Sequence, residues 1–190
     1  MNLSAIILAA GEGRRIGVPK AILKIGTSFL ADIQYEFLSC CKFQKIVIVI
    51  GAEAAVVKEC LKYSKYAVVN SNYHLGQFSS LIKGICSVDS CRGVLVLPVD
   101  VYPLEKLVLD RLVNEVDESF DAVVPVNYGR RGHPVILLDR LVRRLAKYDV
   151  KDSRLDFILR ECRVKEVYVN SKSIFYNINT LDNLEKLNIS

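Results

Sequence analysis

A glycine-rich loop that carries several cations is the part of this sequence that most plainly predicts chemistry. Residues 8–20 read L-A-A-G-E-G-R-R-I-G-V-P-K and continue an apolar run. Glycines such as Gly11 and Gly13 let backbone N–H groups approach phosphate oxygens closely and form an anion-binding nest. Arg14 can hold phosphate oxygens with its forked guanidinium group, and Lys20 can act as a mobile point charge. The loop therefore predicts a phosphate-binding site.

Two familiar phosphate-binding motifs do not fit this loop. The dinucleotide fingerprint G-x-G-x-x-G needs a glycine where Ile16 stands, and Gly17 comes one residue late. The P-loop needs a G-K-[ST] triplet, which the sequence lacks. A plain turn with surface cations is the alternative, and the full string directly after a buried strand argues against it.

The elements that position the loop follow from short β-branched runs that alternate with helical patterns. The runs predict strands at 4–8, 45–50, 66–69, 93–99, 121–126, 134–138, 164–169 and 174–178. Apolar residues at helical spacing predict helices at 30–41, 56–61, 77–88, 104–116, 141–145, 155–162 and 181–187. This alternation is typical of an α/β fold, with a mostly parallel sheet and helices on both faces.

The segments that follow the predicted strands are the candidates for a site, because ligands of open α/β sheets bind outside the carboxyl ends of the strands. These segments are 11–20, 70–80, Asp100, 127–133, and Asn177 with Asn179. They are also unusual in composition. We expect the ligand site among them, outside the carboxyl ends of the strands.

Length and composition exclude several classes of protein. The 190 residues are 51% apolar and 25% charged with a net charge of +5, which is typical of one globular domain. The longest apolar runs, 5–10 and 46–50, are too short to span a membrane, and the N-terminus lacks the layout of a secretory signal. Six cysteines without a C-x-x-C pair indicate neither a disulfide framework nor a zinc site. We therefore expect a cytoplasmic protein without nucleic-acid or membrane partners.

Five ordered segments together resemble a known family. Besides residues 8–20, they are 72–81 (N-Y-H-L-G-Q-F-S-S-L), 97–103 (L-P-V-D-V-Y-P), 129–135 (G-R-R-G-H-P-V) and 177–184 (N-I-N-T-L-D-N-L). The set is similar to the motifs of the MobA-like NTP transferases, the nucleotidyltransferases related to the molybdenum-cofactor cytidylyl- and guanylyltransferases. The resemblance covers nearly the whole chain. It implies a Rossmann-like, three-layer α/β/α fold of the nucleotide-diphospho-sugar transferase type, with residues 1–190 as a single domain.

The resemblance implies an enzyme that transfers a nucleoside monophosphate from an NTP to a phosphorylated acceptor and releases pyrophosphate. The acceptor phosphate must approach an α-phosphate that is already negative. Catalysis of such a step is mostly positioning and neutralisation of charge. By this resemblance Lys20 and Arg14 would hold the triphosphate and the charge that develops on pyrophosphate.

The resemblance also implies a Mg²⁺ ion, which needs few protein ligands besides substrate phosphates. Asp100 is the expected ligand, and a turn or cap aspartate before Pro103 is its alternative. Asn179 is expected to add an amide oxygen, and an N-cap of the closing helix is its alternative. The family usually has carboxylates where Asn177 and Asn179 stand. This departure supports a rival interpretation, a nucleotide-binding module that has lost catalysis.

The remaining site residues are likewise carried over from the resemblance. Asn72, Ser79 and Ser80 are expected to bind the nucleotide together with Leu8, Ala9, Ala10, Gly11, Gly13, Arg14, Lys20 and Asp100. For the two serines, capping of the helix that they open is the alternative. Gly132 and His133 are expected on the acceptor side, and a structural turn histidine is the alternative for His133. The family's G-D-x-G-A-R segment is matched only loosely by residues 151–154, so its arginine is either Arg154 or absent.

Ala10 bears on the choice of base. The string L-A-A-G resembles the cytidylyltransferase branch, whereas guanylyltransferases typically have L-A-G-G; sugar nucleotidyltransferases that use UTP or TTP also have L-A-A-G. We therefore expect CTP as the donor. Molybdopterin is the expected acceptor, with a transient contact to a molybdoenzyme or its chaperone, and a sugar or polyol phosphate is the alternative.

Overall fold

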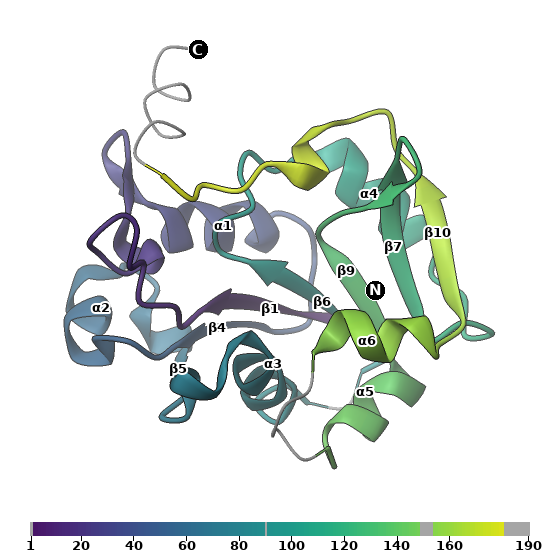
Figure 1. Cartoon of the computed structure of the whole chain (residues 1–190), viewed down its shortest axis with the longest axis horizontal. Helices are drawn as coiled ribbons and strands as arrows, with labels where there is room; N and C mark the ends of the chain where they lie inside the picture. The colour runs from purple at the N-terminus through teal and green to yellow at the C-terminus, as the bar shows by residue number, and fades with distance from the viewer. Residues whose placement is uncertain (1, 90, 149–153, 181–190) are drawn as a thin grey trace.

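The fold is an open mixed sheet with helices on both faces (Figure 1). The computed structural model describes residues 2–89, 91–148 and 154–180. The sheet has the strand order β10-β7-β9-β6-β1-β4-β5, with β8 paired to β7. Its strands are β1 (Leu3–Ala9), β4 (Ile46–Ile50), β5 (Ala67–Val69), β6 (Gly93–Pro98), β7 (Ala122–Asn127), β8 (Arg130–Arg131), β9 (Val135–Leu138) and β10 (Val164–Tyr168).

The helices are close to their predicted positions. They are α1 (Leu30–Ser39), α2 (Ala54–Cys60), α3 (Gln77–Ile85), α4 (Lys106–Asn114), α5 (Asp139–Leu145) and α6 (Leu155–Arg160). Short 3₁₀ turns are η1 (Lys20–Ile22), η2 (Ser64–Tyr66), η3 (Tyr73–Leu75) and η4 (Ser173–Phe175), and a small hairpin joins β2 (Lys24–Ile25) to β3 (Ser28–Phe29). No described helix is long and apolar enough to cross a bilayer.

Three parallel, fully buried strands form the centre of the sheet. Every residue of β1, β4 and β6 is buried, and β1 pairs in parallel with both of the others. Strands covered on both faces have no polar face, which is why they read as continuous apolar runs in the sequence. The registers Ala5–Ile46 and Ala5–Leu95 align the carboxyl ends of all three strands.

Two apolar cores lie on opposite faces of the sheet. One packs side chains of α1, α2 and α4, such as Leu38, Val57 and Leu112, against the sheet. The other packs α3, α5 and α6, with Leu81 and Leu145 among its buried residues. In Figure 1, α1 of the first group lies above β1 and β4, and α3 and α5 of the second lie below the strands. The predicted α/β/α layering is confirmed.

Two strands of the described sheet, β8 and β9, run against the rest. β9 pairs antiparallel with β6 and with β7, and β10 is parallel to β7. Because β9 reverses the direction twice, β7 and β10 again point the same way as β1 and β6. The carboxyl ends of these strands therefore lie at one edge of the sheet, as predicted.

The predicted strand at 174–178 is wrong. After η4, this segment crosses the carboxyl edge of the sheet as extended backbone instead of joining the sheet. Its polar groups pair with the loop after β6 and not with an outer strand of the described sheet. The contacts are Tyr102 N to Tyr176 O (3.2 Å), Ile178 N to Asp100 O (2.8 Å) and a bridge between Val101 and Asn177. The helix predicted at 181–187 lies outside the described residues.

Candidate active site

Three residues that are far apart in the sequence meet at the carboxyl edge of the sheet. Lys20 Nζ lies 2.7 Å from Asp100 Oδ2 and 2.8 Å from Asn179 Oδ1. Lys20 begins η1, Asp100 follows β6, and Asn179 comes from the segment that crosses the edge. The side chains of Lys20 and Asp100 are only 19% and 25% exposed, so the ion pair is partly shielded from water.

The oxygen atoms at this junction suit a hard divalent cation. A carboxylate and an amide oxygen are ligands of the kind that Mg²⁺ takes, with water and phosphate oxygens completing its shell. Within the described part of the chain, no three His, Cys, Asp or Glu residues cluster as a metal site. A divalent ion held by Asp100 and Asn179 would therefore depend on substrate oxygens. Asn177 is not part of the junction, because its side chain is exposed and its amide lies 3.5 Å from the Phe175 carbonyl.

The glycine-rich loop is shaped by its own backbone. The N–H groups of Ile16 and Gly17 both donate to the Gly13 carbonyl, at 2.8 and 2.9 Å. Gly13 has φ +64°, and a Cβ there would lie 1.8 Å from the Val18 carbonyl oxygen. Any other residue at this position would force the loop open. Gly11, in contrast, faces open space.

Arg14 does not reach the Lys20–Asp100 junction. Its side chain is 85% exposed and pairs with Glu12 in the same loop. That hydrogen bond raises the pKa of Arg14 above its ordinary value, so the guanidinium group stays charged. Arg14 thus stands at the solvent-facing side of the site.

A first pocket of about 450 Å³ opens beside the junction. It lies between the glycine-rich loop, the segment from η3 to the start of α3, and the loop after β6. Its lining residues are Leu8, Ala10, Gly11, Glu12, Gly13, Arg14, Lys20, Tyr73, His74, Gly76, Gln77, Ser80, Val99 and Asp100. Its lining combines charged side chains with the aromatic rings of Tyr73 and His74.

The segment between β5 and α3 is held by Asn70, a buried residue that begins the candidate segment 70–80 but belongs to none of the motifs. Asn70 Nδ2 donates to Ser79 Oγ at 2.8 Å and to Ser80 Oγ at 3.1 Å, and its Oδ1 accepts the N–H of Asn72 at 3.0 Å. Ser79 Oγ also lies 2.7 Å from the Gly76 carbonyl. The signal that could have found Asn70 is an amide directly after a strand.

Asn72, Ser79 and Ser80 were all expected to bind the nucleotide, but the structure places them in different surroundings. Ser80 lines the first pocket. Ser79 is buried and its hydroxyl is occupied by protein groups, so it is a structural tie and not a ligand contact. Asn72 is exposed and is not among the residues that line the first pocket. No side chain caps α3, whose N-cap position is Gly76.

A second pocket of about 900 Å³ adjoins the first, and the two share Leu8, Gly76 and Gln77. Its apolar part is formed by Leu8, Leu75, Phe78, Leu81, Val96, Pro98, Val124, Val135, Leu155 and Leu159. Its polar part is formed by Gln77, Arg131, His133, Arg154, Asp156 and Arg160. Arg154, the arginine left open by the sequence, therefore lies at this pocket.

Gly132 and His133 stand between the second pocket and the crossing segment. A Cβ at Gly132 would lie 2.6 Å from the Ile174 carbonyl oxygen, so the close approach requires glycine. The N–H of His133 donates to that same carbonyl at 2.9 Å. Burial lowers the pKa of His133, and the negative charge of Asp100 opposes this only in part. The imidazole is therefore neutral at pH 7, and its buried Nδ1 has no partner among the described residues.

Comparison with known proteins identifies the family. The model of the MobA-like NTP transferase domain matches residues 5–172. The chain belongs to the MobA-like NTP transferase family. It is accordingly a nucleotidyltransferase, as the resemblance of its motifs predicts.

Individual relatives agree with this assignment. A probable molybdenum cofactor guanylyltransferase from Geobacillus sp. (strain WCH70) is 26% identical over 190 residues, covering 94% of each protein. The structure of Rv0371C from Mycobacterium tuberculosis H37Rv in complex with manganese has a TM-score of 0.81 at 18% identity and covers all of both chains. Molybdopterin-guanine dinucleotide biosynthesis protein A from Archaeoglobus fulgidus has a TM-score of 0.71 at 20% identity, covering 98% of this chain and 97% of that one. These likenesses confirm the predicted fold.

In this MobA-like transferase, the loop that carries Asp100 is held from behind by Gln34 of α1. Gln34 is fully buried, and its Nε2 lies 2.9 Å from the carbonyl oxygens of Val99 and Val101 and 3.3 Å from that of Pro98. Gln34 belongs to none of the sequence motifs. Its signal is a polar side chain four residues after Leu30 and four before Leu38, within an apolar stripe.

We expect Gln34→Leu to lower kcat about tenfold while KM for the NTP changes little. The leucine keeps the volume but leaves buried carbonyls without a donor, which costs about 1–3 kcal/mol and loosens the loop that positions Asp100. Steady-state kinetics together with thermal unfolding would measure both effects. Gln44→Leu, at an exposed position, is the matched control. If Gln34→Leu unfolds at a lower temperature but keeps the wild-type kcat, Gln34 supports the fold without positioning Asp100.

Proposed function

We propose that this nucleotidyltransferase uses Mg²⁺ to transfer a nucleoside monophosphate from an NTP to molybdopterin, with release of pyrophosphate. The observation that carries the proposal is the Lys20–Asp100–Asn179 junction, which stands at the first of two adjoining pockets. A donor and an acceptor could meet there with their phosphates next to the same charges. Lys20 would hold the triphosphate, and Arg14 would close onto it from the solvent-facing side.

Asp100 and Asn179 would hold the metal ion in this proposal. When bound, Mg²⁺ would neutralise phosphate charge and so ease the approach of the acceptor. Lys20 would then share the same negative charge from the protein side, since its ammonium group already touches both proposed ligands. Because Gln34 fixes the loop after β6, the Asp100 backbone would keep its place through the reaction.

The second pocket supports a bulky acceptor with a largely apolar body. Its volume and its ten apolar lining residues suit a fused ring system, whereas a sugar or polyol phosphate would leave that surface uncovered. Arg131, Arg154 and Arg160 at the same pocket suit an anionic group. The relative from Geobacillus, named for the molybdenum cofactor, supports the same acceptor.

The base is where the sequence and the relatives differ. Ala10 supports CTP, because its methyl group lines the first pocket where the guanylyltransferase pattern has glycine. The names of the curated relatives support GTP. We retain CTP as the proposed donor and expect it, with Mg²⁺, to raise the melting temperature more than GTP does. A larger shift with GTP would replace the cytidylyl assignment and leave the family unchanged.

Ala10→Gly should move the preference towards GTP. Removing one methyl group from the wall of the pocket should lower the ratio of kcat/KM for CTP over GTP by roughly tenfold. The matched control is Ala9→Gly, because Ala9 is buried in β1 and is not among the residues that line the pocket. An unchanged ratio in Ala10→Gly would show that this methyl group does not select the base.

The decisive test of the function is pyrophosphate release from a panel of NTPs against candidate acceptors. Molybdopterin, a hexose phosphate and a polyol phosphate represent the acceptor classes. Release with a sugar or polyol phosphate alone would reassign the acceptor. Release with no pair would indicate a nucleotide-binding module without catalysis.

We also propose that residues 1–190 act as a single domain in the cytoplasm. The family match over residues 5–172 and the eight-stranded sheet, to which segments from residue 3 to residue 168 contribute strands, support the first part. The product would be a cofactor that another protein binds. We therefore propose a transient contact with a molybdoenzyme or its chaperone.

A further inference from the structure

Tyr73 adds an aromatic ring to the lining of the first pocket, and no role has been assigned to it in the motif at 72–81 or in the proposed chemistry. Its ring is packed against the loops that follow β1 and β4. A Cβ at Gly51 would lie 2.5 Å from Tyr73 Cβ and 2.9 Å from Ala10 Cβ, so this approach is possible only because residue 51 is glycine. Tyr73, Gly51 and Ala10 thus converge on one spot.

The backbone around Tyr73 is fixed on both sides. Asn70 Oδ1 accepts the N–H of Asn72, and the Tyr73 carbonyl accepts the N–H of Gly76 at 3.0 Å. Across the pocket, the N–H of Ala52 donates to the Ala10 carbonyl at 3.1 Å. The tyrosine is therefore held in place before any ligand binds, which reduces the entropy lost on binding.

The lining of the pocket offers the two kinds of contact that an NTP needs. Lys20, Arg14 and Asp100 contribute charge, and Tyr73 with the edge-on ring of His74 contributes aromatic surface. The triphosphate of a nucleotide needs the first kind of contact and its flat base the second. Aromatic side chains stack on any base, because every base has a π face.

We propose that Tyr73 is the residue on which the nucleobase of the donor stacks. The proposal rests on the proposed function, because it assumes that the first pocket takes the NTP. Stacking of this kind changes affinity by about 5- to 150-fold and discriminates little between bases. Tyr73 would then supply affinity for any NTP, and selection of the base would fall to Ala10 and to the polar side chains of Gln77 and Ser80.

The test compares an NTP with inorganic tripolyphosphate, which carries the charges but no base. Binding of CTP, GTP and tripolyphosphate with Mg²⁺ would be measured by calorimetry on the full-length protein. We expect Tyr73→Ala and Tyr73→Leu to weaken both NTPs by about tenfold and to leave tripolyphosphate within about twofold. Tyr73→Phe, which keeps the ring, should bind all three as the wild type does. Tyr73→Leu keeps the volume beside Gly51, so the comparison survives if alanine destabilises the fold.

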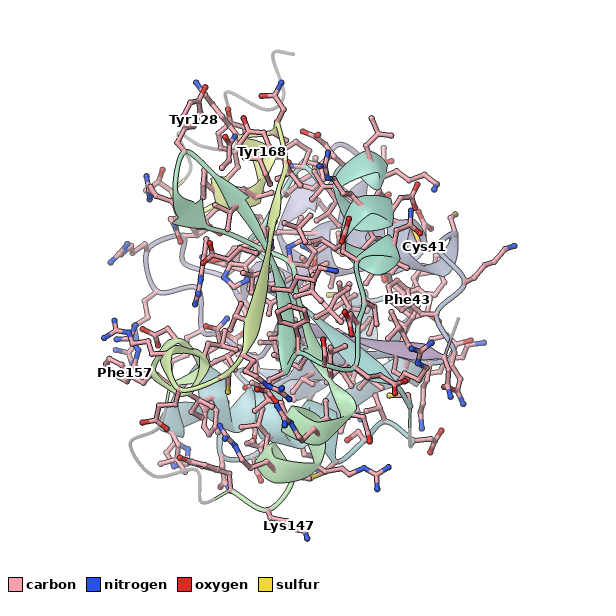
Figure 2. All side chains as sticks on the ribbon, turned by 90° about the vertical axis from the view of Figure 1, so that its right-hand side faces the viewer. Cys41, Phe43, Tyr128, Lys147, Phe157 and Tyr168 are labelled. Atoms are coloured by element: carbon pink, nitrogen blue, oxygen red, sulfur yellow. The ribbon has the colours of Figure 1, made fainter. Side chains whose placement is uncertain are left out.

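Tyr168→Ala is the matched control, because this exposed tyrosine lies on β10 at the far end of the sheet (Figure 2). Equal losses for the NTPs and for tripolyphosphate would overturn the proposal, since they would show that Tyr73 only shapes the pocket. NTP binding unchanged in Tyr73→Leu would overturn it as well. Pyrophosphate release by the wild type is a separate readout: its absence would remove the proposed function, whereas the difference between NTP and tripolyphosphate concerns the stacking alone.

Discussion

Lys20→Ala should lower kcat/KM for pyrophosphate release by about 100-fold or more while the protein stays folded. Lys20 Nζ is the cation that the structure places within 2.8 Å of both proposed metal ligands. Its ammonium group is held in position before the substrate binds, so its removal takes away stabilisation of the charge that develops on pyrophosphate. Steady-state kinetics with saturating Mg²⁺ would measure the loss.

The matched control for this variant is Lys24→Ala, four residues further along and exposed in β2. It should change kcat/KM by less than about threefold, because an exposed charge is screened by water and salt. Lys20→Arg is also informative, since it keeps the charge but changes the geometry and should recover only part of the activity. Activity of Lys20→Ala within about threefold of the wild type would remove Lys20 from the catalytic machinery.

Asp100→Ala should reduce activity by a similar factor, about 100-fold or more, with little change in folding. Asp100 supplies the carboxylate at the junction, and it lies after the end of β6 and not in either core. Without it, the phosphates would keep their mutual repulsion. The measurement is a magnesium titration of pyrophosphate release beside a thermal unfolding curve. A variant that stays active would show that the proposed metal centre is wrong.

Asn179→Asp, in contrast to Asp100→Ala, should strengthen the binding of Mg²⁺. It adds a charge to a hard oxygen site, so the Mg²⁺ concentration for half-maximal activity should fall. Aspartate caps a helix about as well as asparagine, so a residue that only caps would give no such shift. Asn177→Asp is the matched control, because Asn177 is exposed and its amide turns to the Phe175 carbonyl. If Asn179→Asp leaves the Mg²⁺ dependence unchanged while Asp100→Ala loses activity, Asn179 is not a metal ligand, and Asp100 holds the ion together with substrate oxygens and water alone.

The sequence by itself determined the layers of the fold and the edge at which the site lies. The strands β1, β4 and β6 are apolar throughout because both of their faces are covered, and this pattern is local. The shape of the loop at 8–20 is also local, since Gly13 must adopt a positive φ beneath the Val18 carbonyl. Parallel strands bring their carboxyl ends together, which is why Lys20 and Asp100 could be assigned to one site before their distance was known.

Only the tertiary structure decided which side chains reach that site. The direction of β9, the path of the segment at 173–180, and the choice of Asn179 over Asn177 depend on contacts between residues far apart in the chain. The supporting contacts of Gln34 and Asn70 are likewise made to other segments, so neither residue stands out by spacing alone. The outward direction of the Arg14 side chain and the apolar part of the second pocket also could not be predicted from the sequence. A local pattern reports whether a side chain is buried, but the partner it meets is set by how the loops pack once the sheet has formed.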